Sequence, residues 1–163
     1  MNTAKNNLIA CDMGLKRIGL AHILNGIILP LPAITRKNKT QALSELENLL
    51  TQRQAKILVV GMPHLCGVQT QSALNSAFEA SELSENEAIR QTQLRIWHCI
   101  KALDFSGDIY FINEDYSSKQ SEDKLAHLGR KNRQSAQKDG RVDSLSACEI
   151  LQNFLNASVI DRH

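Results

Sequence analysis

The sequence predicts an α/β fold in which helices cover both faces of a mixed β-sheet. The first part of the chain contains three apolar segments joined by tight turns, a pattern typical of an antiparallel meander. The remainder alternates between helical and strand-like spacing of its apolar residues. Strands that are connected through helices pair in parallel. We therefore predict three antiparallel strands followed by two parallel strands, within one domain over 1–163.

The composition is that of an ordinary globular protein. Of the 163 residues, 42% are hydrophobic and 22% are charged, which is enough apolar material for a single core. Aromatic residues make up only 4%, which disfavours the base stacking on which single-strand binders depend. The net charge of +2 is too small to identify a nucleic-acid binder, so that case depends on how charge is distributed locally.

The polar N-terminus and the spacing of the cysteines favour a cytoplasmic protein. The N-terminal tail 1–6 is polar, and no segment has the roughly 18 consecutive apolar residues that a membrane span needs. The four cysteines are widely scattered, without the spacing of a zinc or redox motif. We therefore expect thiols in a reducing cytoplasm.

The predicted meander comprises the segments Leu8–Cys11, Ile18–Leu24 and Ile27–Ile34. The Asn25-Gly26 pair between the second and third segments is a strong hairpin signal. The third segment contains two prolines, which cannot donate hydrogen bonds to a neighbouring strand. We expect this strand to lie at the edge of the sheet or to end early.

Helical and strand-like patterns alternate after the meander. Four leucines between 43 and 50 recur at helical spacing, and Thr40 is a candidate N-terminal cap for this helix. Residues 56–63 form a continuous apolar run, which is typical of a central strand covered on both faces. A second helix is predicted over 88–103, and a second parallel strand over 108–113.

The remaining segments are less regular. Residues 64–84 are predicted to form a flexible loop with weak helical character, and 118–128 a short helix. Residues 129–141 have almost no apolar content, which predicts a second flexible loop. The final helix is predicted from 142 to about 156. It is expected to bury four side chains: Leu145, Cys148, Leu151 and Leu155.

Three carboxylates are placed where they could form one site. Asp12 follows the first strand, Glu114 follows the last strand, and Asp143 begins the final helix. In open α/β sheets, ligands bind at the carboxyl ends of the strands. If the first and last strands are neighbours or one strand apart, Asp12 and Glu114 meet at one edge of the sheet, and Asp143 could complete a triad. Adjacent carboxylates repel each other, and Mg²⁺ or Mn²⁺ would relieve that repulsion. Two such ions about 4 Å apart can support phosphodiester cleavage.

Each carboxylate also has a purely structural interpretation. Asp12 before Met13-Gly14 is typical of an Asx turn as well. Glu114 fits a solvated strand end. Asp143 in a first helical turn suits the helix dipole whether or not it binds a metal. The residues alone therefore leave both interpretations open.

Basic residues flank the predicted site. Lys16 and Arg17 lie in the turn beside Asp12. The segment that leads into Asp143 carries five cations: Arg130, Lys131, Arg133, Lys138 and Arg141. A phosphate backbone needs such a strip of positive charge, although a solvated charged loop has the same composition. Its position immediately before Asp143 favours nucleic-acid binding.

Four motifs extend this pattern along the chain. Asp-x-Gly-x-Lys-Arg-Ile-Gly runs from Asp12 to Gly19, and Val-Gly-x-Pro ends at Pro63. An acidic strand end spans 113–115, followed by a pair of serines, and Val-Asp with small and apolar residues spans 142–147. In these motifs the chain resembles the YqgF-like family, which is described both as Holliday junction resolvases and as pre-16S rRNA nucleases with an RNase H-like fold.

The resemblance implies metal-dependent phosphodiester hydrolysis by Asp12, Glu114 and Asp143, which would serve as catalytic residues and metal ligands. The sequence departs from the family pattern at Asp115, where the family commonly has arginine, and at Asn113, where it has an acid. The segment from 64 to 87 also looks longer than usual and lacks the family's Asn-x-x-Gly loop.

Three functions remain to be compared. The first is a Mg²⁺- or Mn²⁺-dependent nuclease acting on branched DNA or precursor rRNA, as a monomer or a homodimer. The second is a nucleic-acid-binding module whose catalysis is weak or lost, as Asp115 suggests. The third is a phosphotransferase of the actin or sugar-kinase type. Its need for two domains and a second glycine-rich phosphate loop argues against it.

Overall fold

The computed structural model describes residues 7–65, 67–80, 84–113 and 141–160, with the side chains of 141–143 and 158–160 excepted. None of the helices in this described part is long and apolar enough to span a membrane.

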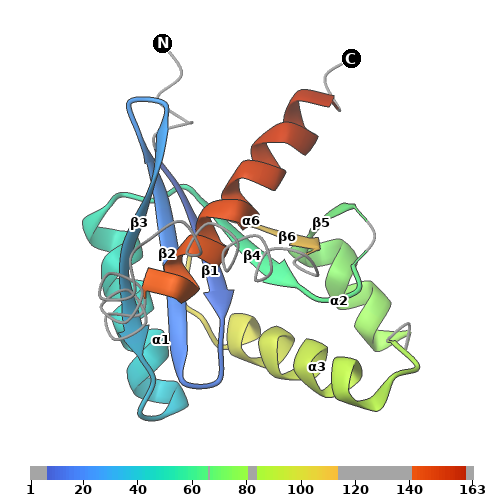
Figure 1. Ribbon diagram of the computed structural model, residues 1–163. Coiled ribbons are helices and arrows are strands. Elements are labelled where there is room, and N and C mark those ends of the chain that lie inside the picture. Colours follow the sequence, from blue (N-terminus) through green and yellow to red (C-terminus); the bar gives the residue numbers. More distant parts are fainter. Residues whose placement is uncertain (1–6, 66, 81–83, 114–140, 161–163) are drawn as a thin grey trace, which may run out of the picture.

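A six-stranded mixed sheet forms the centre of the molecule, with the order β3-β2-β1-β4-β6-β5 (Figure 1). Its strands are β1 Leu8–Met13, β2 Arg17–Leu24, β3 Ile27–Thr35, β4 Ile57–Met62, β5 Val68–Thr70 and β6 Asp108–Asn113. The pairs β1–β2 and β2–β3 are antiparallel, whereas β1–β4 and β4–β6 are parallel. The predicted arrangement of three antiparallel strands followed by two parallel strands is confirmed.

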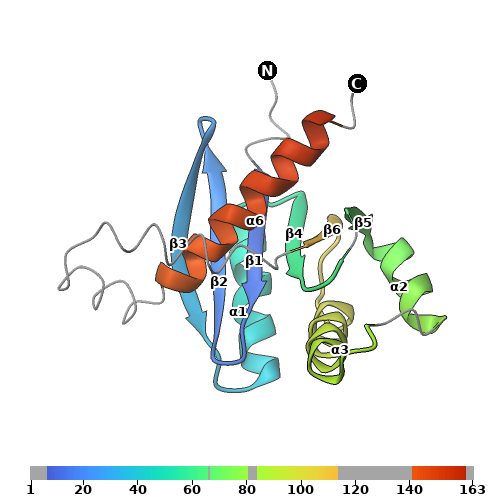
Figure 2. The ribbon, with the colours of Figure 1, turned by 45° about the vertical axis from the view of Figure 1, so that its right-hand side comes forward.

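Helices cover both faces of this sheet. They are α1 Lys39–Gln52, α2 Gln71–Glu79, α3 Glu87–Lys101 and α6 Arg141–Ile160. Helix α6 crosses in front of the sheet, and α1 lies behind it (Figures 1 and 2). One core unites β1 residues Ile9 and Cys11 with α1 and α3, and a second core unites Leu8 and Ala10 with α6. Alternate residues of β1 therefore face opposite layers.

The third strand lies at the edge of the sheet, as its prolines predict. Strand β3 pairs with β2 on one side through Ile18–Ile34 and Leu20–Leu31, among other pairs. The register shifts between Ile18 and Leu20, which marks a bulge.

The predicted loop over 64–84 is wrong in part, because it contains β5 and α2. The three-residue strand β5 adds antiparallel to β6, so the sheet has one strand more than predicted. Thr70 caps α2 by accepting a hydrogen bond from the Ala73 amide at 3.2 Å. Leu74 and Phe78 are buried, and Phe78 packs edge-on against Trp97 with ring centroids 4.8 Å apart. Tertiary contacts therefore stabilise a helix whose own sequence signal is weak.

The cap predicted for α1 is also wrong: Asn38, not Thr40, begins the helix. The Asn38 side chain accepts from the Gln41 amide at 2.8 Å, and the Gln41 side chain accepts from the Asn38 amide at 3.3 Å. This reciprocal capping box requires Asn and Gln three positions apart, a spacing that Thr40 does not offer.

The final helix is confirmed, but its predicted buried face is wrong. Among the side chains described in α6, the buried apolar ones are Ala147, Ile150, Leu151 and Phe154. Only Leu151 belongs to the predicted set, since Leu145, Cys148 and Leu155 are half-buried. The small residues Ala10 and Ala21 beneath α6 share its core, and they fix which strip of the helix faces the sheet. The tail 1–6, the helix at 118–128 and the loop at 129–140 lie outside the described residues, whereas the backbone of Arg141 begins α6.

Replacing Asn38 with alanine should lower the free energy of unfolding by about 1 kcal/mol, because the Gln41 amide at the start of the helix loses its acceptor. Replacing Thr40 with alanine is the matched control and should change that free energy by less than about 0.5 kcal/mol. Urea denaturation of both variants measures the difference. Equal losses would contradict the capping box.

Candidate active site

Asp12 lies near the carboxyl end of a central strand. It is the fifth residue of β1, which has β2 on one side and β4 on the other. Leu8 and Ala10 precede it on the same face of the strand, and both belong to the core that includes α6. Its half-buried carboxyl group therefore belongs to the α6 side of the sheet.

Glycines flank Asp12 on this face. Gly19 of β2 pairs directly with Asp12. On the other side of β1, Cys11 pairs with Val60 of β4, so the next residue of β4, Gly61, is level with Asp12. Neither neighbour has a side chain to fill the space next to the carboxylate. Neither β2 nor β4 therefore places a side chain directly beside the Asp12 carboxylate.

The turn after Asp12 depends on Gly14. The Gly14 amide donates to the Asp12 carbonyl at 3.0 Å, and a Cβ atom on Gly14 would overlap the carbonyl oxygen of Arg17. Lys16 is exposed on this turn, and Arg17, the first residue of β2, is half-buried. Both predicted cations therefore follow Asp12 closely along the chain.

Arg36 holds this turn from the other side. Its guanidinium donates to the Gly14 carbonyl at 3.2 Å and approaches the Cys99 sulfur at 3.5 Å. Its amide donates to the Lys16 carbonyl at 2.8 Å. The turn is thus tied both to the segment before α1 and to α3.

Gln93 fixes the end of β4. This α3 side chain is only 5% exposed, and its amide nitrogen donates to the Pro63 carbonyl at 2.9 Å. Its carbonyl oxygen accepts from the Ser84 amide at 3.1 Å. The Val-Gly-x-Pro motif is therefore held at its last residue by a buried polar side chain.

The start of α6 is bonded to the neighbouring strand. Ser144 is fully buried, and its hydroxyl contacts the Leu20 amide at 3.3 Å and the Leu31 carbonyl at 2.5 Å. Leu20 adjoins Gly19, the partner of Asp12. The first turn of α6, which includes the backbone of Asp143, therefore lies on the same face of the sheet as Asp12.

The last parallel strand lies one strand away from β1, which is the arrangement that the predicted convergence requires. Glu114 follows β6 in the sequence but lies outside the described residues, as do the side chain of Asp143 and the cations from Arg130 to Arg141. The complete triad and its basic strip therefore stay predictions.

Among the side chains that the structure describes, no three His, Cys, Asp or Glu residues are grouped as they would be around a metal ion. That statement does not cover Glu114 or the side chain of Asp143, two of the three predicted ligands.

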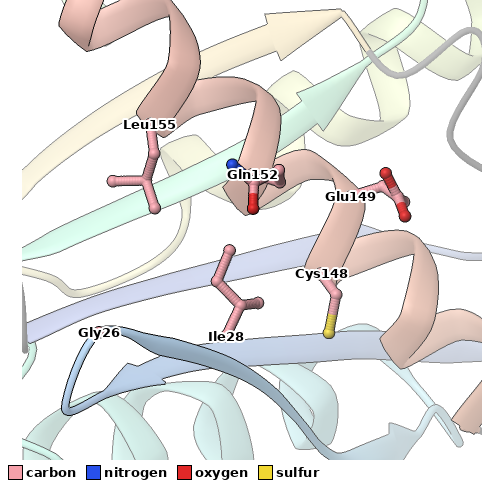
Figure 3. Close-up of a pocket in the computed structure, with 6 residues that line it drawn as sticks. All are labelled: Gly26, Ile28, Cys148, Glu149, Gln152 and Leu155. Atoms are coloured by element: carbon pink, nitrogen blue, oxygen red, sulfur yellow. The ribbon is translucent and has the colours of Figure 1, made fainter.

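A cavity of about 430 Å³ lies elsewhere on α6. It is lined by Gly26, Ile28, Cys148, Glu149, Gln152 and Leu155 (Figure 3). The cavity adjoins the β2–β3 turn, whereas Asp12 adjoins the β1–β2 turn at the other end of β2. It is therefore separate from the predicted site.

Sequence reasoning missed Arg36, Gln93 and Ser144 as residues that hold the site. Gln93 had a detectable signal, because it interrupts the apolar stripe of α3 between Ile89 and Ile96 at helical spacing. A buried glutamine there indicates a backbone partner. No comparable signal marks Arg36.

The chain is similar to known proteins over most of its length. The family described as "RuvX: Holliday junction resolvase" matches residues 6–157. A "putative pre-16S rRNA nuclease" of Helicobacter pylori (strain P12) is 48% identical over 147 residues, which are 90% of this chain and 93% of the relative. Proteins of the same name from Helicobacter hepaticus and Campylobacter lari are 49% and 36% identical, over 92% and 90% of this chain and 95% and 94% of their own lengths.

Replacing Gly14 with alanine should destabilise the fold by about 1–3 kcal/mol, because the added Cβ forces the turn apart. Leu15 is 72% exposed, so Leu15→Ala is the control and should change stability by less than about 0.5 kcal/mol. Thermal unfolding compares the two. A Gly14→Ala variant as stable as Leu15→Ala would show that the turn does not need glycine.

Proposed function

The chain belongs to the RuvX family, and from this premise we propose that it is a divalent-metal-dependent nuclease for structured nucleic acid. Its proposed substrate is either a Holliday junction, in DNA recombination and repair, or the 5′ extension of pre-16S rRNA, in ribosome biogenesis. Both reactions hydrolyse a phosphodiester bond, and we place them in the cytoplasm.

The observation that supports this proposal most directly is the position of Asp12. Its carboxylate lies between Gly19 and Gly61 at the carboxyl end of a central strand, on the face where α6 begins. The adjoining positions of β2 and β4 carry no side chain beside this carboxylate, which supports a ligand site there.

The residue types fit a hard divalent cation. Asp12, Glu114 and Asp143 would supply the carboxylate oxygens that Mg²⁺ and Mn²⁺ prefer. When bound, such ions activate a water molecule and stabilise the leaving oxygen. The half-burial of Asp12 supports this role, since a carboxylate removed from bulk water is a stronger partner for a cation.

The chain's own cations would bind the substrate. Lys16 is exposed on the β1–β2 turn, four residues after Asp12, where it would contact a phosphate of the substrate. Arg17 begins β2 directly after this turn. Arg130, Lys131, Arg133, Lys138 and Arg141 would extend the contact along the backbone.

Asp115 supports a second candidate, a nucleic-acid-binding module with weak or lost catalysis. It adds a negative charge next to Glu114 where the YqgF-like pattern commonly has an arginine. Such a charge repels the phosphate that the nuclease must hold.

The oligomeric state would differ between substrates: a two-fold symmetric junction suits a homodimer, whereas an rRNA end suits a monomer.

Replacing Asp12 with asparagine should lower the cleavage rate at least about 100-fold, because it removes a charged ligand while keeping its shape. The assay incubates the protein with a four-way DNA junction and with 5′-extended rRNA, in Mn²⁺, in Mg²⁺ and in chelator. Binding of the same substrates should persist in the variant.

Binding without cleavage by the unsubstituted protein, on either substrate and with either metal, would contradict the nuclease and favour the binding module. Cleavage that continues in chelator would contradict the proposed dependence on a divalent metal.

Replacing Lys16 with alanine should weaken binding and reduce the slope of log K against log salt by about 0.9, the value expected for one lost phosphate contact. Lys56 is also exposed but precedes β4, at the opposite end of the strands from Asp12. Lys56→Ala makes the same change of charge and should leave the slope unaltered. Salt titration of binding distinguishes them, and equal slopes would exclude Lys16 from the interface.

A further inference from the structure

The hydroxyl of Ser144 bridges two strands. It contacts the Leu20 amide of β2 at 3.3 Å and the Leu31 carbonyl of β3 at 2.5 Å, and Leu20 and Leu31 are paired across the sheet. A hydroxyl can accept from an amide and donate to a carbonyl at the same time. Ser144 therefore satisfies one donor and one acceptor of the sheet with a single side chain from α6.

The bridge lies at an irregularity in the sheet. The β2–β3 register shifts between Ile18 and Leu20, so β3 has an extra residue opposite Gly19. Pro32, which lacks an amide hydrogen, is part of that bulge. Bulges disrupt the ladder locally, and here the hydroxyl from α6 takes part in the bonding.

This position is one residue away from the partner of Asp12. Gly19 pairs with Asp12, and Leu20, the next residue, bonds Ser144. Asp143 directly precedes Ser144 in α6. The same bridge thus connects the strand position opposite Asp12 with the helix position next to Asp143.

The buried apolar side chains described in α6 are Ala147, Ile150, Leu151 and Phe154. Ser146 and Glu149 of the same helix are also buried and have interactions of their own. Apolar contacts are non-directional, so they favour burial without fixing where a helix sits along its axis. Hydrogen bonds weaken steeply with distance and angle, so the Ser144 bridge can fix that position.

We propose that Ser144 is a positioning residue, which sets the placement of residue 143 relative to Asp12 by clamping the start of α6 to the β2–β3 bulge. This inference rests on the proposed function, because the placement of residue 143 matters only if residue 143 and Asp12 bind the same metal site. Ser144 itself touches neither substrate nor metal in this account.

The test compares Ser144→Ala with Ile150→Val. The first removes the bridge, and the second removes one methyl group from the same helix, at a side chain that is 0% exposed. Both lower stability, but only the first should loosen the start of α6. Measurements are made where both variants are fully folded.

Three readouts separate positioning from stability. In Ser144→Ala, hydrogen exchange of the Leu20 amide should accelerate at least tenfold beyond the change in Ile150→Val. Calorimetry should show Mn²⁺ affinity reduced about 10-fold, in the range expected when a residue behind a ligand is lost. The kcat for cleavage should fall at least about 10-fold with KM nearly unchanged, whereas Ile150→Val should retain both constants. Ser144→Thr keeps the hydroxyl and should restore slow exchange at Leu20.

The outcomes also distinguish this inference from the proposed function. If the unsubstituted protein binds Mn²⁺ but cuts neither substrate, the nuclease is contradicted, and weaker Mn²⁺ binding in Ser144→Ala would still support the positioning role. If Ser144→Ala and Ile150→Val show equal Mn²⁺ affinity and equal Leu20 exchange, the positioning role is overturned, whatever the cleavage assay gives.

Discussion

The parallel pairing of β1, β4 and β6 is the constraint on which the site depends. Their register aligns Leu8 with Ile57 and Asp108, so the carboxyl ends of all three strands lie side by side at the same end of the sheet. A shift of β1 by one residue would turn Asp12 from the α6 face to the core that contains Leu46 and Ile96. Burying a charge in that core would cost several kcal/mol. The apolar residues of β1 therefore fix the face of its one carboxylate.

Side chains from other elements hold the ends of these strands. Arg36 bonds the turn after β1, Gln93 bonds the residue that follows β4, and Ser144 bonds β2 beside the partner of Asp12. Each makes a polar bond to backbone, and buried groups of this kind resist displacement because their loss leaves a partner unsatisfied. A site built from several separate segments needs such bonds, since misplacement by about 1 Å can cost about 100-fold in rate.

Local sequence signals predicted the framework well. The Asn25-Gly26 turn, the prolines of β3 and the apolar run of β4 each depend on neighbouring residues, and the structure confirms what they predict. A motif also marks Asp12 as a candidate ligand, and that role stays a prediction. What could not be predicted depends on distant partners. Strand β5 has three residues and exists through its pairing with β6.

The contacts that hold the site were equally hidden from the sequence. Arg36 and Gly14 are 22 positions apart, and Ser144 and Leu31 are 113 apart. The buried face of α6 was predicted incorrectly for the same reason, since helical spacing does not show which strip of a helix meets the sheet. Two of the three predicted ligands, Glu114 and Asp143, were inferred from position along the chain, and their joint placement stays a prediction.

The central claim is that the end of β1 and the start of α6 lie at one divalent-metal site. Paramagnetic broadening of backbone amide signals by Mn²⁺ measures this directly, because the effect falls off steeply with distance from the ion. The account predicts strong broadening at Asp12, Gly19 and Gly61 and in the first turn of α6, with little at Leu8 or Ile57 at the opposite ends of the same strands. Broadening that spares Asp12, or that centres on the opposite ends, would contradict it.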